Sequence, residues 1–125
     1  MIFGIGTDLV QVDRIQKSLQ SPTFFSRVFG PQEQAFLQGL AEKRRAESAA
    51  ACFAAKEAFL KACGKGLGGF ALADIQALRK ESGAPWYALR GEAQEFCQKE
   101  GLRVSLSLSH EGGMALAFAV LEKDG

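Results

Sequence analysis

FAAKEAFLKACGKG, the stretch at 53–66, predicts a long helix that packs inside the protein and around which the fold is built. Most of its side chains are alanine, phenylalanine or leucine, and Gly64 is a natural helix stop. At 100° per residue, the large apolar residues of a helix over 46–63 form one arc. Lys56 projects into this arc, where an interior helix would not be expected to carry a charge.

Glu57 and Lys61 are spaced i, i+4 and so share a face that adjoins the apolar arc. At a surface such a pair stabilises the helix by about 0.2–0.5 kcal/mol, and this structural interpretation stays open. Charges among alanine and phenylalanine lose hydration, which favours a site that uses them. Asp8, in an apolar segment flanked by glycines, either caps the following helix or belongs to the same site. If Asp8 and Glu57 converge, their oxygens form a partial shell for Mg²⁺, and Lys61 would lie next to bound phosphates.

The remaining pattern predicts an α+β chain. The start reads as a short strand in which Gly4 and Gly6 permit the close approach of another backbone or a ligand. The 42–45 segment, EKRR, reads as a charged connector before the central helix. The other predicted elements are helices over 12–19, 31–40 and 92–101, strands over 72–78 and 86–89, and a β-hairpin over 104–109 and 114–121.

Bulk composition excludes several classes of protein. The 125 residues make one domain, 1–125, and a net charge of +1 does not call for nucleic acid as a partner. No apolar run approaches the roughly 20 residues of a membrane helix, and the N-terminus lacks the features of a signal peptide, so a cytoplasmic location is expected. Three cysteines without C-x-x-C spacing predict neither a disulfide framework nor a zinc site.

Two further features are ambiguous. His110, the only histidine, stands where a strand meets a turn, and it is either a polar strand end or a ligand contact. The glycine-rich loop over 64–69 is not a Walker loop, and its plain role is a helix exit. Its backbone N–H groups and Lys65 could nevertheless cradle a phosphate.

Three stretches together resemble one family: GIGTDLVQVDRI at 4–15, FAAKEAFLKACGKG at 53–66 and SLSHEGGMALAFAV at 107–120. In this order they look like the holo-acyl-carrier-protein synthases, the small bacterial 4′-phosphopantetheinyl transferases. The resemblance implies Mg²⁺-dependent transfer of the 4′-phosphopantetheine of coenzyme A to a serine of apo acyl carrier protein, in support of fatty acid biosynthesis. It also implies an antiparallel sheet packed with a central helix, assembled as a homotrimer with active sites at the subunit clefts.

Residue by residue, the resemblance implies a metal held by Asp8 and Glu57. Lys61 would contact the transferring phosphate or assist deprotonation of the serine. Binding of coenzyme A would involve Lys61 together with Lys43, Arg44, Ser109 and His110.

One position departs from the family pattern: Cys52 stands where an arginine is usual, so the contact of that arginine with coenzyme A is either missing or supplied by a neighbour such as Lys56. The turn Gly83-x-Pro85 matches the family's G-x-P turn. Because acyl carrier proteins are acidic, Arg14, Lys17 and Arg27 are candidates for docking the partner.

Two other functions use the same residues. A Mg²⁺-dependent nucleotide pyrophosphate hydrolase would use the carboxylates with water as acceptor. A non-catalytic nucleotide-binding module would keep Glu57 and Lys61 only as a structural pair.

Overall fold

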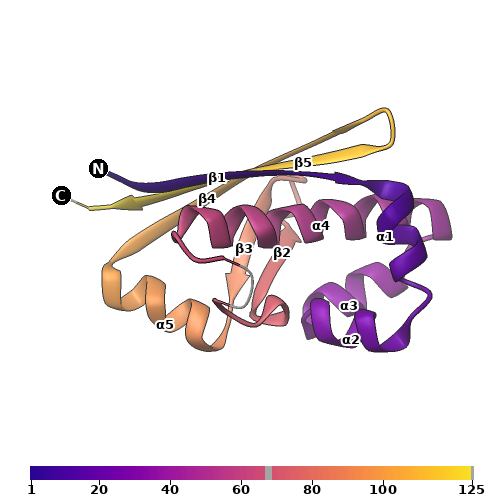
Figure 1. The fold of residues 1–125 in the computed structure, drawn as a ribbon, viewed down its shortest axis with the longest axis horizontal. Coiled ribbons are helices and arrows are strands. Elements are labelled where there is room, and N and C mark those ends of the chain that lie inside the picture. Colours follow the sequence, from indigo (N-terminus) through magenta and orange to yellow (C-terminus); the bar gives the residue numbers. More distant parts are fainter. Residues whose placement is uncertain (67–68, 125) are drawn as a thin grey trace.

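A three-stranded antiparallel sheet lies across one side of the long helix α4 (Glu42–Ala62) (Figure 1). The computed structural model describes residues 1–66 and 69–124. The strand order is β1-β5-β4, with β1 (Ile2–Gln11), β4 (Leu102–Glu111) and β5 (Met114–Lys123). The predicted hairpin is β4–β5, and Gly112 and Gly113 in its turn have φ of 57° and 77°. Two positive φ values in a row favour glycine at both positions.

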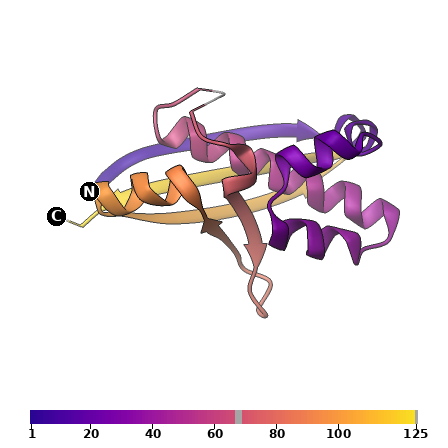
Figure 2. The same ribbon diagram turned by 90° about the horizontal axis from the view of Figure 1, so that it is seen from below.

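The other side of α4 is covered by a β-hairpin and shorter helices (Figures 1 and 2). The hairpin consists of β2 (Ile75–Arg79) and β3 (Pro85–Leu89). The α5 helix (Gly91–Glu100) lies towards one end of α4, and at the other end lie α1 (Val12–Ser18), α2 (Pro22–Val28) and α3 (Pro31–Gln38). No helix in the described ranges is long and apolar enough to cross a bilayer. The predicted α+β class is confirmed.

The α4 helix is buried on several sides because it is the middle layer, and 12 of its 21 residues are buried. Small side chains let the sheet approach closely: three β5 alanines that face α4, Ala115, Ala117 and Ala119, are fully buried. A Cβ added at Gly4 or Gly6 of β1 would lie 1.9 or 2.0 Å from a carbonyl oxygen of α4. The predicted close approach at these glycines is confirmed, and the backbone approached is that of α4.

Lys56 is buried in the interior, as its place in the apolar arc predicts. Its ammonium donates to the Glu33 carboxylate and to the carbonyl oxygens of Leu72 and Ile75 at 3.0 and 2.8 Å. Glu33 is also fully buried, and its second oxygen accepts from the backbone N–H of Ala77 at 2.9 Å. This pair ties α3 and α4 to the start of β2.

Three sequence predictions differ from the structure. The 42–45 segment is not a connector but the first turn of α4, and Arg45 there donates to the carbonyl oxygens of Leu37 and Leu40 at 2.9 and 2.8 Å. The α2 helix was missed because Ser21-Pro22 resembles a turn, yet the Ser21 hydroxyl accepts from Phe24 N–H as a helix cap. Of the strand expected over 72–78, residues 72–74 form a 3₁₀ turn.

Candidate functional site

Lys61 connects the central helix to the first strand. Asp8 lies on β1 opposite Ala117 of β5, on the face of the sheet that packs against α4. The Lys61 ammonium donates to Asp8 Oδ1 at 3.2 Å and to the Thr7 carbonyl oxygen at 2.9 Å. Within the described ranges this is the ion pair that Lys61 forms, so the alternative in which Lys61 pairs only with Glu57 does not hold.

Asp8 and Glu57 converge on one cavity of ≈ 270 Å³, which we call the carboxylate cavity. Its full lining is Asp8, Leu9, Val10, Arg14, Phe53, Glu57 and Leu72. Burial, and then the negative charge of Asp8, raise the pKa of the Glu57 carboxyl, while Lys61 opposes the rise. A carboxyl whose pKa is raised by a neighbouring carboxylate marks a place where a cation is favoured.

The donor set of this cavity fits Mg²⁺ better than a metal held by protein alone. In the part of the chain that the structure describes, no three or more His, Cys, Asp or Glu side chains are grouped for a metal. Zinc sites in proteins use three or four such ligands. Magnesium ions are bound by one or two carboxylates, with water and substrate phosphates completing the octahedron. Asp8 and Glu57 are sufficient for an ion of the second kind.

A second hollow, of ≈ 450 Å³, is lined by several basic side chains along the first half of α4, and we call it the basic hollow. Its lining is Phe36, Arg44, Glu47, Ser48, Ala51, Arg79, Gly83 and His110. Two of the predicted nucleotide-binding residues, Arg44 and His110, therefore meet here. Two others do not line it: Ser109 pairs with exposed Leu116, so it points to the opposite face of the sheet from His110, and Lys43 is one helix position from Arg44.

Arg44 of the basic hollow and Glu57 of the carboxylate cavity are far apart along α4 in one chain. Arg44 lies in the first turn of α4, whereas Glu57 lies in its second half, 13 residues later. At 1.5 Å rise per residue this separates the two by about 20 Å along the helix. A single subunit does not bring all the predicted site residues together.

Position 52 has no role in binding anions. Cys52 is buried, its thiol donates to the Ala77 carbonyl oxygen at 3.5 Å, and burial raises its pKa to about 12. Lys56, one of the two alternatives for replacing an arginine there, is held by Glu33 in the interior, so it does not supply that contact. Arg79 of β2 does line the basic hollow, and sequence reasoning missed it because only the folded hairpin brings β2 beside α4.

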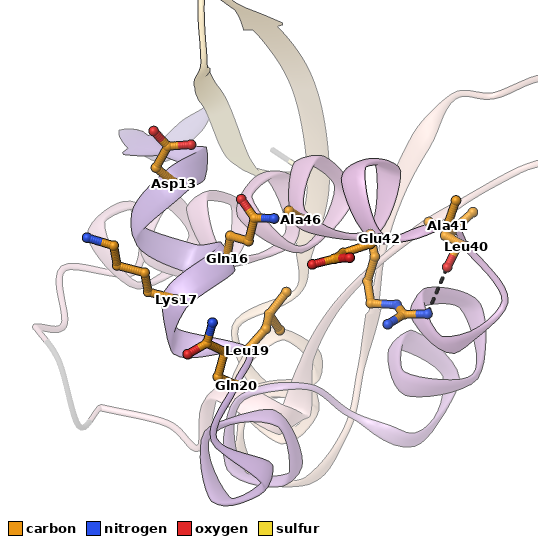
Figure 3. A pocket seen from close by; sticks show the side chains of 10 residues that line it. Asp13, Gln16, Lys17, Leu19, Gln20, Leu40, Ala41, Glu42 and Ala46 are labelled. Atoms are coloured by element: carbon orange, nitrogen blue, oxygen red, sulfur yellow. Dashed lines mark hydrogen bonds between the residues drawn. The ribbon is translucent and has the colours of Figure 1, made fainter.

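The basic residues proposed for docking are spread over two elements. Arg14 of α1 lines the carboxylate cavity, and Arg27 of α2 is exposed. Lys17 lines a third hollow of ≈ 540 Å³ between α1 and the start of α4 (Figure 3). Asp13 and Glu42 line it as well, and Arg45 there is bound to backbone carbonyl groups, so this hollow has no excess of free cations.

Part of the glycine-rich loop, residues 67 and 68, lies outside the described residues. The Lys65 ammonium, before this gap, lies over the rings of Phe70 and Phe96, 5.3 and 5.6 Å from their centroids. This contact attracts the lysine by a cation–π interaction. The structure therefore gives Lys65 aromatic neighbours.

Comparison with known proteins gives one consistent family. The family described as the 4′-phosphopantetheinyl transferase superfamily matches residues 4–119. A holo-[acyl-carrier-protein] synthase of Geotalea daltonii is 42% identical over 127 residues, covering 98% of this chain and 100% of that protein. One of Clostridium novyi is 41% identical over 126 residues, covering 99% and 90%.

Two solved structures share the fold. A holo-(acyl-carrier-protein) synthase from Bacillus anthracis, in complex with CoA (3′,5′-ADP), superimposes with a TM-score of 0.85 at 34% identity, covering 99% of each chain. An acyl carrier protein synthase from Plasmodium yoelii with ADP bound gives 0.89 at 33% identity, covering 100% of this chain and 98% of that one.

Proposed function

This chain belongs to the 4′-phosphopantetheinyl transferase superfamily, and from that premise we propose which of its residues carry out the reaction. The reaction is the transfer of the 4′-phosphopantetheine of coenzyme A to a serine of apo acyl carrier protein, as in the holo-[acyl-carrier-protein] synthases that the chain resembles. The serine hydroxyl loses its proton, and its oxygen forms a bond to the phosphorus that bears the pantetheine. The bond to the second phosphate breaks, and adenosine 3′,5′-bisphosphate leaves.

The observation that carries the assignment is the carboxylate cavity, which Asp8 of β1 and Glu57 of α4 both line. Lys61 lies beside it through its ion pair with Asp8. Asp8 and Glu57 are the residues that hold Mg²⁺. When bound there, the ion supplies charge neutralisation for the pyrophosphate, which is the main requirement of phosphoryl-group transfer. The ion pair between Asp8 and Lys61 is partly exposed, with 55% of the Lys61 side chain accessible, so it is weak enough to be exchanged. Lys61 then contacts the transferring phosphate.

The substrate spans two subunits in this proposal. The pyrophosphate and the 3′-phosphate of coenzyme A are joined through one ribose, whereas Arg44 and Glu57 are about 20 Å apart along α4. A second copy of the chain is needed to bring its Arg44 and His110 to the nucleotide held at Asp8 and Glu57 of the first.

The surface for this assembly is the outer face of the three-stranded sheet. Ile5 and Leu9 of β1 and Leu116 and Phe118 of β5 are 41–59% exposed and share this face. Apolar side chains gathered on one sheet face are typical of a surface that packs against another subunit. We assign the homotrimer that the resemblance implies to contacts through this face.

Acyl carrier protein docks beside the carboxylate cavity. Arg14 lines that cavity and is exposed, and Arg27 lies on the exposed side of α2. An acidic partner held by these residues would present its serine to the pyrophosphate. Both substrates and the three free cysteines favour the cytoplasm as the location.

Intact-protein mass spectrometry of apo acyl carrier protein, incubated with the chain, coenzyme A and Mg²⁺, tests the assignment. We expect a mass gain of one phosphopantetheine, lost with EDTA and in Glu57→Gln. Glu42→Gln, which removes an exposed carboxylate of the same helix, is the matched control and should retain the gain. Cleavage of coenzyme A without carrier protein would indicate a hydrolase, and full activity of Asp8→Asn would contradict the metal site.

A further inference from the structure

Arg79 is a cation of the basic hollow whose binding capacity is largely unused. It ends β2, opposite Pro85 of β3, and its Nη1 donates to the Gly83 carbonyl oxygen at 3.3 Å. Among residues 1–66 and 69–124, no acidic side chain forms an ion pair with Arg79 or with Arg44, although Glu47 lines the same hollow. A guanidinium has five N–H donors, so most of those on Arg79 remain for a ligand.

Arg79 lies on a strand that is attached to α4 beside position 52. The Cys52 thiol is bound to the carbonyl group of Ala77, which attaches β2 to α4 at that point. Arg79 follows Ala77 by two residues and so lies on the same face of the strand. With Ala51 of α4 also lining the hollow, the guanidinium enters it from the strand instead of from the helix.

The chemistry of the hollow indicates which phosphate it takes. Coenzyme A has a pyrophosphate and a separate 3′-phosphate, and the pyrophosphate belongs at the carboxylate cavity, where the bond breaks. The basic hollow has two arginines and one histidine against a single carboxylate, Glu47. It therefore lacks the paired carboxylates for a metal and suits an anion that is bound but does not react. Arginine binds such a phosphate with two parallel hydrogen bonds.

We infer that Arg79, together with Arg44 and His110, binds the 3′-phosphate of coenzyme A and supplies the guanidinium that position 52 lacks. This inference rests on the proposed function. Arg79 selects the substrate by its 3′-phosphate, so its contribution is to binding and not to the transfer step.

Steady-state kinetics with coenzyme A and with 3′-dephospho-coenzyme A test the inference. In Arg79→Gln we expect the KM for coenzyme A to rise about tenfold or more, because a charge-assisted hydrogen-bond pair is lost. The kcat and the KM for 3′-dephospho-coenzyme A should stay unchanged, since that substrate lacks the group that Arg79 binds. Lys80→Gln removes the neighbouring positive charge outside the hollow and should change neither KM. Equal effects of Arg79→Gln on both substrates, or no effect on either, would overturn the inference.

A binding measurement separates this inference from the proposed function. Calorimetry compares adenosine 3′,5′-bisphosphate with adenosine 5′-monophosphate on the wild-type protein and on Arg79→Gln. The inference predicts that the variant loses affinity for the first ligand only. If the wild-type protein transfers nothing to carrier protein, the proposed function fails, but the difference between the two nucleotides still supports or contradicts the role of Arg79.

Discussion

Replacing Lys56 by methionine should destabilise the fold and leave coenzyme A binding intact. The methionine side chain has a similar length but no charge, so the buried Glu33 carboxylate loses the cation that it faces. Removing one partner of a buried ion pair costs about 3–5 kcal/mol, because the other charge stays desolvated. Domains of ordinary size have a free energy of unfolding of about 5–15 kcal/mol, so the loss is a large share of the total.

Urea unfolding followed by far-ultraviolet circular dichroism measures this effect. The midpoint should fall while the slope stays constant, which indicates a change in stability and not in the unfolded state. Lys99→Met, on the exposed side of α5, is the matched control and should stay within about 0.5 kcal/mol of the wild type. The double variant Glu33→Gln/Lys56→Met should be more stable than Lys56→Met alone, because the uncompensated charge is gone.

One result would refute the reasoning. If the free energy of unfolding of Lys56→Met is within about 1 kcal/mol of that of the wild type and its KM for coenzyme A rises, Lys56 is a substrate ligand and not an interior cation. Simple additivity of the Glu33 and Lys56 substitutions in the free energy of unfolding would also refute the reasoning, since residues in one buried pair must be coupled.

Three further predictions concern the sheet and the carboxylate cavity. Gly6→Ala should lower the free energy of unfolding by about 1–3 kcal/mol, because its Cβ would lie 2.0 Å from the Ala58 carbonyl oxygen. Gly66→Ala is the control, since its Cβ would enter open space and should not lower the free energy of unfolding. Equal urea midpoints for the two variants would contradict the prediction. Without divalent ions, Glu57→Gln should melt higher than the wild type at pH 7, since a raised pKa penalises the ionised carboxylate in the folded state. The difference in melting temperature should vanish below pH 4.5, the ordinary pKa of a glutamate, because the carboxyl is then protonated in both states. A difference that does not depend on pH would refute the prediction. If the chain forms the proposed homotrimer through the outer sheet face, Phe118→Asp should sediment as folded monomers in sedimentation velocity. A variant that sediments like the wild-type assembly would exclude this face as the interface.

Several elements were predictable because they depend on residues a few positions apart. The central helix, its stop at Gly64 and the β4–β5 hairpin follow from periodicity and turn glycines. The burial of Lys56 follows from its angle on the helix. The start of α4 did not follow, because EKRR is polar, and it is contacts of Arg45 with the carbonyl groups at the end of α3 that hold this turn in place.

The candidate site was predictable as a set of residues but not as an arrangement. Asp8, Glu57 and Lys61 are conspicuous because each charge stands in an apolar setting. Their pairing was mistaken, since i, i+4 spacing favours Glu57 as the partner of Lys61 whereas the structure pairs Lys61 with Asp8. No sequence pattern predicted Arg79 as a site residue, because its position in the basic hollow depends on how the β2–β3 hairpin packs.

The sequence by itself determined most of the elements, the membership of the family and the charges that need an explanation. Only the tertiary structure decided which charges meet: Lys61 and Asp8 are 53 residues apart in the chain, and Lys56 and Glu33 are 23 apart. Local patterns report the backbone conformation because neighbouring residues control it. The partner of a charge depends on which distant segments pack together, and here glycines and alanines set that packing by allowing β1 to touch α4.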